Sequence, residues 1–317
     1  MMSTNKKKVL ILTDSEDDHL ATIVRHLQKE SINYLAIDIN QEYRQSLGLS
    51  AGRINGYLSQ CKKTINFDDI GAVLVRRVPL PKTDQGAYQT YIHSEKSEAF
   101  LALFYALKDR LWLNPLDTMQ IAENRLAHIA EANKCGIKTP KHTLITNVKR
   151  DAYRVAEKEA LLIKTMGWKR EITKGRGLYA TKILADDITK NISNCPVMFQ
   201  SQIKKEFDVR ITLVNKIVFG AKISNKTDVG YVDWRKTQNE FNTTVIEIPK
   251  SLERKCQCLA DKLKLKLCSI DFAVDRRGEY YFLEINAMTD WLWIERKTKM
   301  PITDTLAKYL KSELKSS

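Results

Sequence analysis

Three oxygen-bearing side chains near the C-terminus have the types and the spacing of a metal site. Asp271 stands among apolar residues, and Glu284 and Asn286 lie two positions apart in a second apolar segment. The sequence Asp-Arg-Arg-Gly at 275–278 joins the segments and predicts a β-hairpin. Residues i and i+2 of a strand face the same side, so the hairpin can bring the two carboxylates together. Carboxylates are costly to bury without a partner, and this oxygen donor set suits Mg²⁺. The alternative, a solvent-facing polar stripe, is disfavoured by the apolar flanks.

Basic residues that precede the hairpin suit a phosphate-bearing ligand. Lys164 ends the apolar run 161–163, where a lysine can project into a cleft and hold phosphate oxygens. The loop 166–177, MGWKREITKGRG, combines glycines with basic side chains. A glycine-containing loop can close backbone N–H groups over phosphates. Taken singly, each feature also fits a solvated surface lysine or a solvated basic loop.

A further stretch has the composition of a nucleotide-binding hinge. The apolar strand 196–203 leads into polar residues and can offer backbone groups to an adenine edge. Glu206 or Asp208 is expected to accept a ribose hydroxyl. Arg210 is expected to neutralise a phosphate, with Asp208 orienting it, and Lys222 is expected to face the same cleft.

Hydrophobic periodicity predicts the elements that position these residues. Short apolar strands at 7–13, 34–39 and 72–76, with a helix at 19–29, predict an N-terminal α/β region. A long helix is predicted at 94–111. From about residue 140 the pattern changes to an antiparallel α+β region. The predicted domains are 1–115, 116–200 with the basic loop, and 201–317 with the metal site.

Composition limits the class of protein. No apolar run reaches the length of a membrane span, and the polar N-terminus is no secretory signal, so we expect a cytoplasmic protein. None of the six cysteines forms a CxxC pair, which predicts free thiols. The net charge of +14 favours an acidic or polyanionic partner. Its basic residues are spread along the chain without a zinc-finger, RRM or KH signature, so nucleic acid is not the expected partner.

The order of these features resembles the ATP-grasp superfamily over residues 114–294. The resemblance implies an ATP-grasp fold with an N-terminal α/β (pre-ATP-grasp) domain, a central domain and a C-terminal domain carrying the metal site. It also implies ATP and Mg²⁺ as cofactors and an acyl-phosphate intermediate. Many members carry a lysine in the helix before the central domain, where this chain has Arg125. The implied magnesium ligands are Asp271, Glu284 and Asn286, and the implied nucleotide contacts are Arg125, Lys164, Gln200, Ser201, Gln202 and Ile203.

Four short motifs resemble a narrower family, the microviridin-type peptide ligases or graspetide synthetases. They are VRR at 75–77, LWLNP at 111–115, VDWR at 232–235 and WLWIE at 291–295. The resemblance implies that Asp or Glu side chains of an acidic ribosomal precursor peptide, with leader and core, are phosphorylated. Ser, Thr or Lys side chains then attack to close ester or amide cross-links. Lys222 and Arg235 would contact the core and the transferred phosphate, Asp233 is the candidate proton acceptor, and a homodimer is implied.

Two other functions compete with this interpretation. A RimK-like ligase that appends an amino acid would share the metal and nucleotide residues, and only the tryptophan-containing motifs argue against it. A nucleic-acid-binding protein without catalysis would use the positive charge, but it would leave the carboxylate hairpin without a role.

Overall fold

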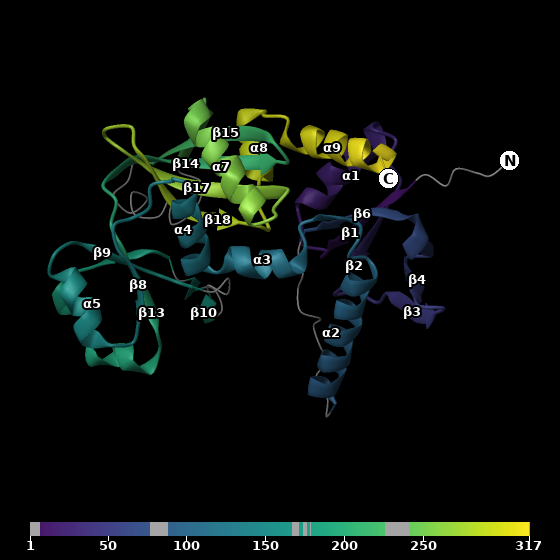
Figure 1. Cartoon of the computed structure of the whole chain (residues 1–317), viewed down its shortest axis with the longest axis horizontal. Coiled ribbons are helices and arrows are strands. Elements are labelled where there is room, and N and C mark those ends of the chain that lie inside the picture. Colours follow the sequence, from purple (N-terminus) through teal and green to yellow (C-terminus); the bar gives the residue numbers. More distant parts are fainter. Residues whose placement is uncertain are drawn as a thin grey trace. The chain divides into compact units, whose positions relative to one another are not determined.

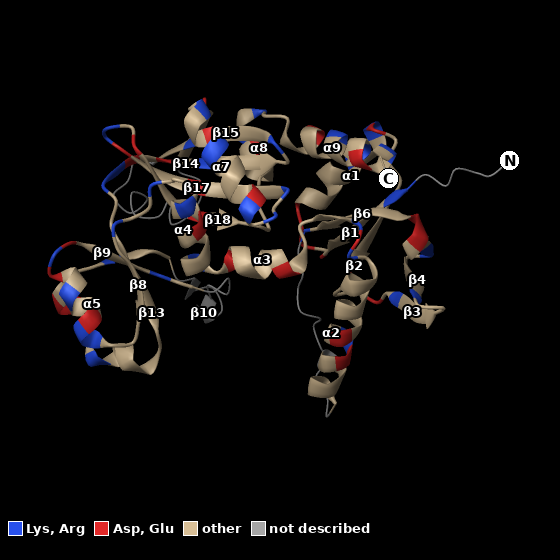
Figure 2. Ribbon diagram, in the orientation of Figure 1, with Lys and Arg blue, Asp and Glu red and all other residues tan. Residues whose placement is uncertain are grey.

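The computed structural model describes residues 7–76, 88–166, 171–173, 176–177, 179–225 and 241–316, which belong to two compact units (Figure 1). Unit 1 comprises Met1–Leu116, Leu265–Leu267 and Pro301–Ser317. Unit 2 comprises Asp117–Lys264 and Cys268–Met300. Lys and Arg occur on elements of both units (Figure 2), as expected from their spread along the sequence.

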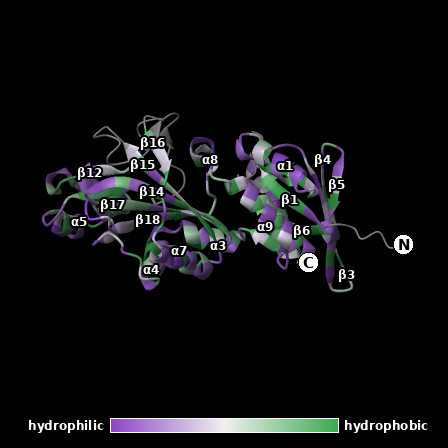
Figure 3. Cartoon of the chain, turned by 90° about the horizontal axis from the view of Figure 1, so that it is seen from above, coloured by the Kyte–Doolittle hydropathy of each residue, from purple (hydrophilic) through white to green (hydrophobic). Residues whose placement is uncertain are grey.

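Unit 1 is built on a parallel sheet with the strand order β2-β1-β6-β7. Its strands are β1 (Lys8–Thr13), β2 (Tyr34–Asp38), β6 (Ile70–Val75) and β7 (Leu111–Leu113). Nearly every residue of β1 and β6 is buried, and both strands are rich in hydrophobic residues (Figure 3). Continuous apolar runs of this kind are typical of parallel strands covered on both faces. The predicted N-terminal α/β region is confirmed.

Three helices accompany this sheet: α1 (His19–Lys29), α2 (Gln89–Ala106) and α9 (Ile302–Ser316). The buried side of α2 carries Phe100 and Leu103, and the helix begins earlier and ends earlier than the predicted range 94–111. None of the described helices is long and apolar enough to cross a membrane.

A small antiparallel sheet in unit 1 was not predicted from the sequence. It consists of β3 (Arg44–Ser50), β4 (Arg53–Gln60) and β5 (Lys63–Asn66). Most of its side chains are exposed or half-buried, so its hydrophobic alternation is weak. Leu58 and Ile65 are the fully buried exceptions.

Arg76, from the VRR motif, is part of the interior of unit 1. Its Nε lies 3.2 Å from Asp17 Oδ2, and Asp17 also contacts His19 Nδ1 at 3.1 Å. All three side chains are at most 3% exposed. This buried ion pair joins the segments that follow β1 and β6. Arg77 lies outside the described residues.

Asn114, from the LWLNP motif, ties a distant segment into unit 1. Its Nδ2 donates to the carbonyl of Leu267 at 2.6 Å, and its Oδ1 accepts from the N–H groups of Lys266 and Leu267 at 2.8 and 3.1 Å. These bonds explain why Leu265–Leu267 belongs to unit 1 although the surrounding residues belong to unit 2.

Unit 2 contains two larger sheets and a two-stranded ribbon formed by β10 (Glu171–Thr173) and β11 (Arg176–Gly177). The first sheet has the order β12-β9-β13-β8 and is antiparallel, and the second has the order β16-β15-β14-β17-β18. The first contains β8 (Thr143–Thr146), β9 (Leu161–Lys164), β12 (Thr181–Ile183) and β13 (Val197–Ser201). The second contains β14 (Lys205–Val214), β15 (Ile217–Asn225), β16 (Phe241–Val245), β17 (Leu267–Asp275) and β18 (Tyr280–Asn286).

The described α-helices of unit 2 are α3 (Leu116–Glu123), α4 (Arg125–Lys134), α5 (Lys149–Ala156), α7 (Lys250–Lys262) and α8 (Leu292–Thr298). Ala152 of α5 packs with Leu161 and Phe199 in a buried apolar cluster on one face of the first sheet. The other face of that sheet, which carries Lys164 and Gln200, is left for the site.

The domain boundaries differ from the prediction at Leu265–Leu267, described above, and at the C-terminal helix. The predicted C-terminal domain, 201–317, includes α9, whereas the structure places Pro301–Ser317 in unit 1. There α9 packs against α1 and β6. The division of the remaining chain into domains 116–200 and 201–317 stays a prediction, although each range has its own sheet. All six cysteines are free thiols, as predicted.

Candidate active site

Asp271 and Glu284 lie directly opposite each other because the β17–β18 hairpin changes register next to them. Phe272 pairs with Phe282, but Asp271 then pairs with Glu284. One extra residue, Leu283, is thus accommodated in β18, which is a β-bulge. Without this shift Asp271 would face Leu283, and Glu284 would point to the other side of the sheet. The predicted meeting of the two carboxylates therefore depends on a local irregularity.

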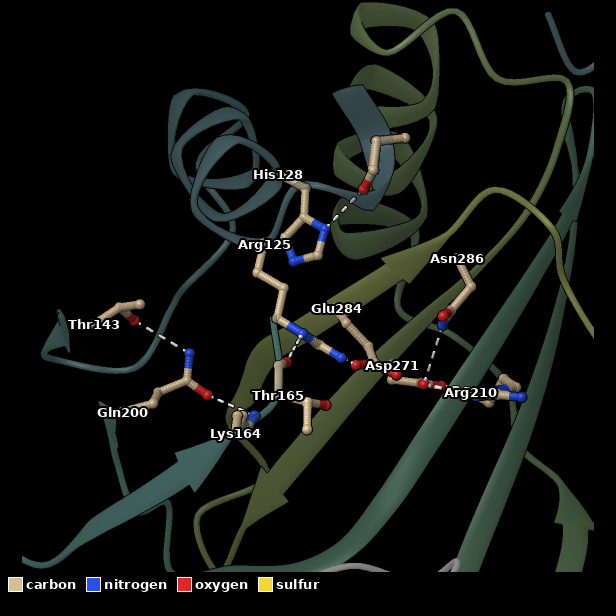
Figure 4. Close-up of polar contacts among 11 residues, drawn as sticks. Arg125, His128, Thr143, Lys164, Thr165, Gln200, Arg210, Asp271, Glu284 and Asn286 are labelled. Atoms are coloured by element: carbon tan, nitrogen blue, oxygen red, sulfur yellow. Dashed lines mark hydrogen bonds and ion pairs between the residues drawn. The ribbon is translucent and has the colours of Figure 1, made fainter. Parts of the chain in front are cut away.

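Asn286 completes the predicted trio. Its Nδ2 donates to Asp271 Oδ2 at 3.4 Å, and the two carboxylic residues are buried, at 8% exposure for Asp271 and 6% for Glu284 (Figure 4). Two carboxylates and one amide on one face form an oxygen-only donor set that fits Mg²⁺. The residues expected to hold the metal are thus brought together.

Arg210 of β14 forms a two-point ion pair with Asp271. Arg210 Nε lies 2.6 Å from Oδ1, and Nη2 lies 2.7 Å from Oδ2. Such bidentate pairs are among the stronger charge-assisted interactions. The same guanidinium lies 5.8 Å from the ring centroid of Trp293, in the WLWIE motif. Arg210 therefore lies beside the candidate metal ligands, and its expected role in neutralising a phosphate stays a prediction.

Arg125 connects the two larger sheets of unit 2. Its Nη1 donates to Glu284 Oε2, and its Nε donates to the carbonyl of Thr165 at 2.6 Å. Arg125 is the first residue of α4, whose N-cap, Asn124, accepts from the N–H of Ala127 at 3.0 Å. The cap fixes the start of the helix and with it the direction of the arginine. The position at which the family pattern expects a lysine is thus occupied by an arginine within the cluster.

Lys164 is hydrogen-bonded to the side chain of Gln200, a residue that was predicted to contact adenine. Lys164 Nζ donates to Gln200 Oε1 at 2.6 Å, and Gln200 Nε2 donates to Thr143 Oγ1 at 3.1 Å (Figure 4). Gln200 is 1% exposed, and its backbone lies in the middle of the sheet, between Leu162 and Thr143. Its contribution is therefore through the side-chain amide, rather than through backbone contacts to adenine.

The remaining hinge residues differ in what they can offer a ligand. The N–H of Ser201 donates to His142 and the N–H of Gln202 to Ala160, each at 3.0 Å. The carbonyl of Ile203 accepts from Lys205 at 3.0 Å. Among the described residues, the N–H of Ile203 has no hydrogen-bond partner. Ile203 is thus the hinge residue whose backbone donor best suits an adenine edge.

The two acidic candidates for a ribose contact are already paired. Asp208 Oδ2 accepts from Lys205 Nζ at 2.6 Å, and both side chains are buried. Glu206 is exposed, and its carboxylate lies 3.4 Å from Arg276. Glu206 is the more accessible acceptor, so a ribose role for either residue stays a prediction.

Lys222 is not brought into the cluster. It pairs with Val209 of β14, whereas Arg210 pairs with Ala221, so Lys222 and Arg210 lie on opposite faces of the sheet. Its ammonium lies 4.1 Å from the ring centroid of Phe207. The expectation that Lys222 faces the metal cleft is therefore wrong. Asp233, Arg235 and much of the basic loop lie outside the described residues.

A buried hydroxyl network beside Asp271 was not predicted from the sequence. Thr212 Oγ1 lies 3.0 Å from Ser269 Oγ, which also contacts Thr289 Oγ1. Each of these residues is at most 1% exposed. Ser269 lies two positions before Asp271 in a largely apolar strand, so the sequence could have indicated a buried hydroxyl on the same face as Asp271.

His128, one helical turn after Arg125, was also missed. Its Nδ1 lies 2.9 Å from the carbonyl of Ala122, while Nε2 is buried without a partner among the described residues. Burial lowers the pKa of His128 to about 4, and the positive charges of Arg125 and Lys164 act in the same direction. The imidazole is therefore neutral at physiological pH. With Nδ1–H as the donor, Nε2 presents a lone pair.

Comparison with known proteins decides the fold. No protein-family model and no curated protein sequence matches the chain. A RiPP-associated ATP-grasp ligase of Chryseobacterium gregarium, solved with ADP and a leader and core peptide, has a TM-score of 0.89 at 21% identity and covers 97% of both chains. The chain has the ATP-grasp fold. The predicted fold class is thereby confirmed.

Three further solved structures extend the comparison. Macrocyclase MdnC of Microcystis aeruginosa MRC, bound to precursor peptide MdnA, has a TM-score of 0.84 at 21% identity and covers 98% of this chain and 100% of its own. The ATP-grasp ligase PsnB, complexed with a precursor variant, Mg and ADP, has a TM-score of 0.78 at 18% identity and covers 98% and 99%. D-cycloserine synthetase DcsG has a TM-score of only 0.58 at 10% identity. At these identities the likeness concerns the fold.

Proposed function

We propose that the protein is an ATP- and Mg²⁺-dependent ligase that closes ester or amide cross-links within an acidic ribosomal precursor peptide. The observation that carries this proposal is the buried pair of Asp271 and Glu284, facing each other beside Arg125, Arg210 and Lys164. The ATP-grasp fold supports the proposal that the protein binds ATP. The matched structures that were solved with leader, core or precursor peptides support the proposal that its substrate is a precursor peptide.

The proposed reaction has two steps. A carboxylate oxygen of a core Asp or Glu attacks the γ-phosphorus of ATP, and the bond to the bridging oxygen breaks to release ADP. A Ser or Thr hydroxyl or a Lys amine then attacks the acyl carbon, loses its proton, and inorganic phosphate leaves. Each closure removes the elements of one water from the peptide.

In the proposed site, the acidic and amide side chains would bind the metal ion and the basic side chains would bind the phosphates. Asp271, Glu284 and Asn286 would hold Mg²⁺, which when bound would neutralise phosphate charge. Lys164, Arg125 and Arg210 would bind phosphate oxygens and stabilise the charge that develops on them. The N–H of Ile203 would position the adenine. Asp233 and Arg235 keep their proposed roles as proton acceptor and core contact.

Mass spectrometry tests this proposal. The protein is incubated with ATP, Mg²⁺ and the product of any short neighbouring reading frame with repeated Thr or Ser and Asp, Glu or Lys. We expect the peptide mass to fall by one water for each ring, with ADP formed in step. A gain in mass would favour the amino-acid ligase, and salt-dependent DNA binding without ATP hydrolysis would favour the nucleic-acid-binding alternative.

Two further properties complete the proposal. A cytoplasmic location is supported by the ATP requirement and by the six free thiols, which suit a reducing compartment. A homodimer is proposed from the resemblance alone, and sedimentation of the purified protein would test it.

A further inference from the structure

Two thiols of unit 2 lie in contact although 123 positions separate them along the chain. Cys135 directly follows α4, Cys258 lies within α7, and their Sγ atoms are 2.6 Å apart. The two helices pack against each other, and α7 lies beside α4 in Figures 1 and 3. The proposed ligase site uses neither thiol, so the contact calls for a separate explanation.

We propose that Cys135 and Cys258 form a disulfide when the protein is exposed to hydrogen peroxide, and that this bond stabilises unit 2. The sulfur of the first thiol attacks a peroxide oxygen, the O–O bond breaks, and a sulfenic acid and water form. The sulfur of the second thiol attacks the sulfenic sulfur, and the hydroxide that leaves takes up the proton of this thiol. In total two thiols are oxidised and one hydrogen peroxide is reduced to two waters.

The end of α4 holds Cys135 in place. Its N–H donates to the carbonyls of Glu131 and Ala132, each at 3.1 Å. Gly136 follows with a φ of +71°, and a left-handed glycine is a common way to end a helix. The thiol of Cys135 therefore lies against α7 without any rearrangement of a loop.

Cys258 faces α4, whereas Cys256 faces the interior of unit 2. Residues i and i+2 of a helix point to different sides. Cys256 is fully buried, and burial raises the pKa of its thiol. Cys258 is half-buried, as is Cys135. Hydrogen peroxide therefore has access to the contacting pair but not to Cys256.

Basic side chains of α7 flank the pair. Lys262 lies one helical turn after Cys258, and Lys255 lies beside Gly136. Burial and the hydrogen bond with Cys258 raise the pKa of Cys135 to about 12, and the positive charge of Lys262 opposes this rise. The thiolate of Cys135 is therefore scarce at neutral pH, so the pair stays reduced until oxidant is abundant. The nearby cations stabilise the thiolate that then reacts.

The disulfide would close a long loop of unit 2. The segment between the two cysteines contains Lys164, Gln200 and Arg210 of the proposed site. A disulfide restricts the unfolded chain, and the stabilisation grows with the length of the loop that it closes. We therefore expect the oxidised protein to unfold at a higher temperature than the reduced protein.

Intact-mass measurement on the full chain tests the proposal. Cys61→Ser and Cys195→Ser remove the two exposed thiols, and this parent protein is treated with hydrogen peroxide. We expect it to lose the mass of two hydrogen atoms, and proteolysis should give a cross-linked pair of peptides that contain Cys135 and Cys258. The temperature of unfolding should rise by about 5 °C or more, and a thiol reductant should reverse both changes.

Single substitutions in the parent protein separate the pair from the other thiols. Cys258→Ala and, independently, Cys135→Ala should abolish both the loss of mass and the rise in unfolding temperature. Cys268→Ala is the matched control, because it removes a buried thiol and leaves the pair intact. This control should behave like the parent. Each variant is compared with its own reduced form, so any change in stability caused by the substitution itself cancels.

Three results would overturn the proposal. The first is a parent protein that loses no hydrogen at a peroxide concentration that oxidises Cys61 and Cys195 in the unaltered chain. The second is a cross-link that joins other cysteines, or a stable gain of oxygen without a cross-link. The third is a disulfide between Cys135 and Cys258 that leaves the temperature of unfolding unchanged.

Discussion

Asp271 and Glu284 face each other across the β17–β18 hairpin because Leu283 is accommodated as an extra residue in β18. Most irregularities in a strand weaken pairing, but this one moves a carboxylate from the far face of the sheet to the near face. Deleting Leu283 would be expected to restore the regular register and to separate the two carboxylates. The following predictions concern the residues that this arrangement brings together.

Glu284→Gln should abolish ATP turnover while the chain stays folded. The amide keeps the size of the side chain but removes one of the two charges available to the metal. We expect the rate of phosphate release to fall by about 100-fold or more. Circular dichroism should show an unchanged fold. Normal ATP-dependent cross-linking by this variant would refute the metal assignment.

Lys164→Ala should weaken nucleotide binding because one cation is lost from the phosphate site. We expect a loss of about tenfold in affinity, or roughly 1.4 kcal/mol, by calorimetry with AMPPNP and Mg²⁺. Lys190→Ala, at an exposed position of unit 2, is the control and should bind normally. Equal affinity for the two variants would remove Lys164 from the site.

Gln200→Leu should also weaken nucleotide binding, but only through Lys164. Leucine keeps the approximate volume and removes the oxygen that accepts a hydrogen bond from the ammonium, and a hydrogen bond to a charged group contributes about 1.5–3 kcal/mol. In a double-mutant cycle the effect of Gln200→Leu should vanish in the Lys164→Ala background. Additive losses would mean that Gln200 acts on the fold or on the nucleotide independently.

His128 should make the stability of unit 2 depend on pH. Its pKa is lowered from 6.5 to about 4 by burial, so between these values the unfolded chain binds a proton that the folded chain does not. The free energy of unfolding should therefore fall as the pH falls through this window, by on the order of 3 kcal/mol in total. His128→Phe should remove this part of the pH dependence, which urea titrations at pH 7.5 and pH 4.5 would measure. An identical pH profile for both proteins would contradict the burial of a neutral histidine.

The sequence was sufficient to predict the parts of the site that depend on local signals. The turn at 275–278 predicted the hairpin, and the isolated acidic residues in apolar strands predicted buried carboxylates. Arg125 was identified by its place in the order of the pattern, and the structure brings it to Glu284. These inferences need only the composition of a segment and the alternation of a strand.

Features that depend on pairing between strands were not predictable in the same way. The sequence places Lys222 in a strand, β15, as predicted. Whether its side chain shares a face with Arg210 depends on the register between β15 and β14, which the sequence of one strand does not show. The β-bulge at Leu283 likewise cannot be recognised from the sequence of β18 alone, because it is defined by the pairing with β17. Gln200 was expected to serve adenine through its backbone, and only the position of β13 between β9 and β8 shows that its backbone is occupied.

The last helix of the chain has a consequence for synthesis. Lys29 and Asp304 pair at 3.2 Å, Lys311 and Glu30 pair at 2.7 Å, and the buried residues of α9 complete the interior of unit 1. The ribosome makes the parallel sheet before unit 2 and this helix after it. Because α9 follows unit 2 in the sequence, unit 1 can be completed only after unit 2 has been synthesised.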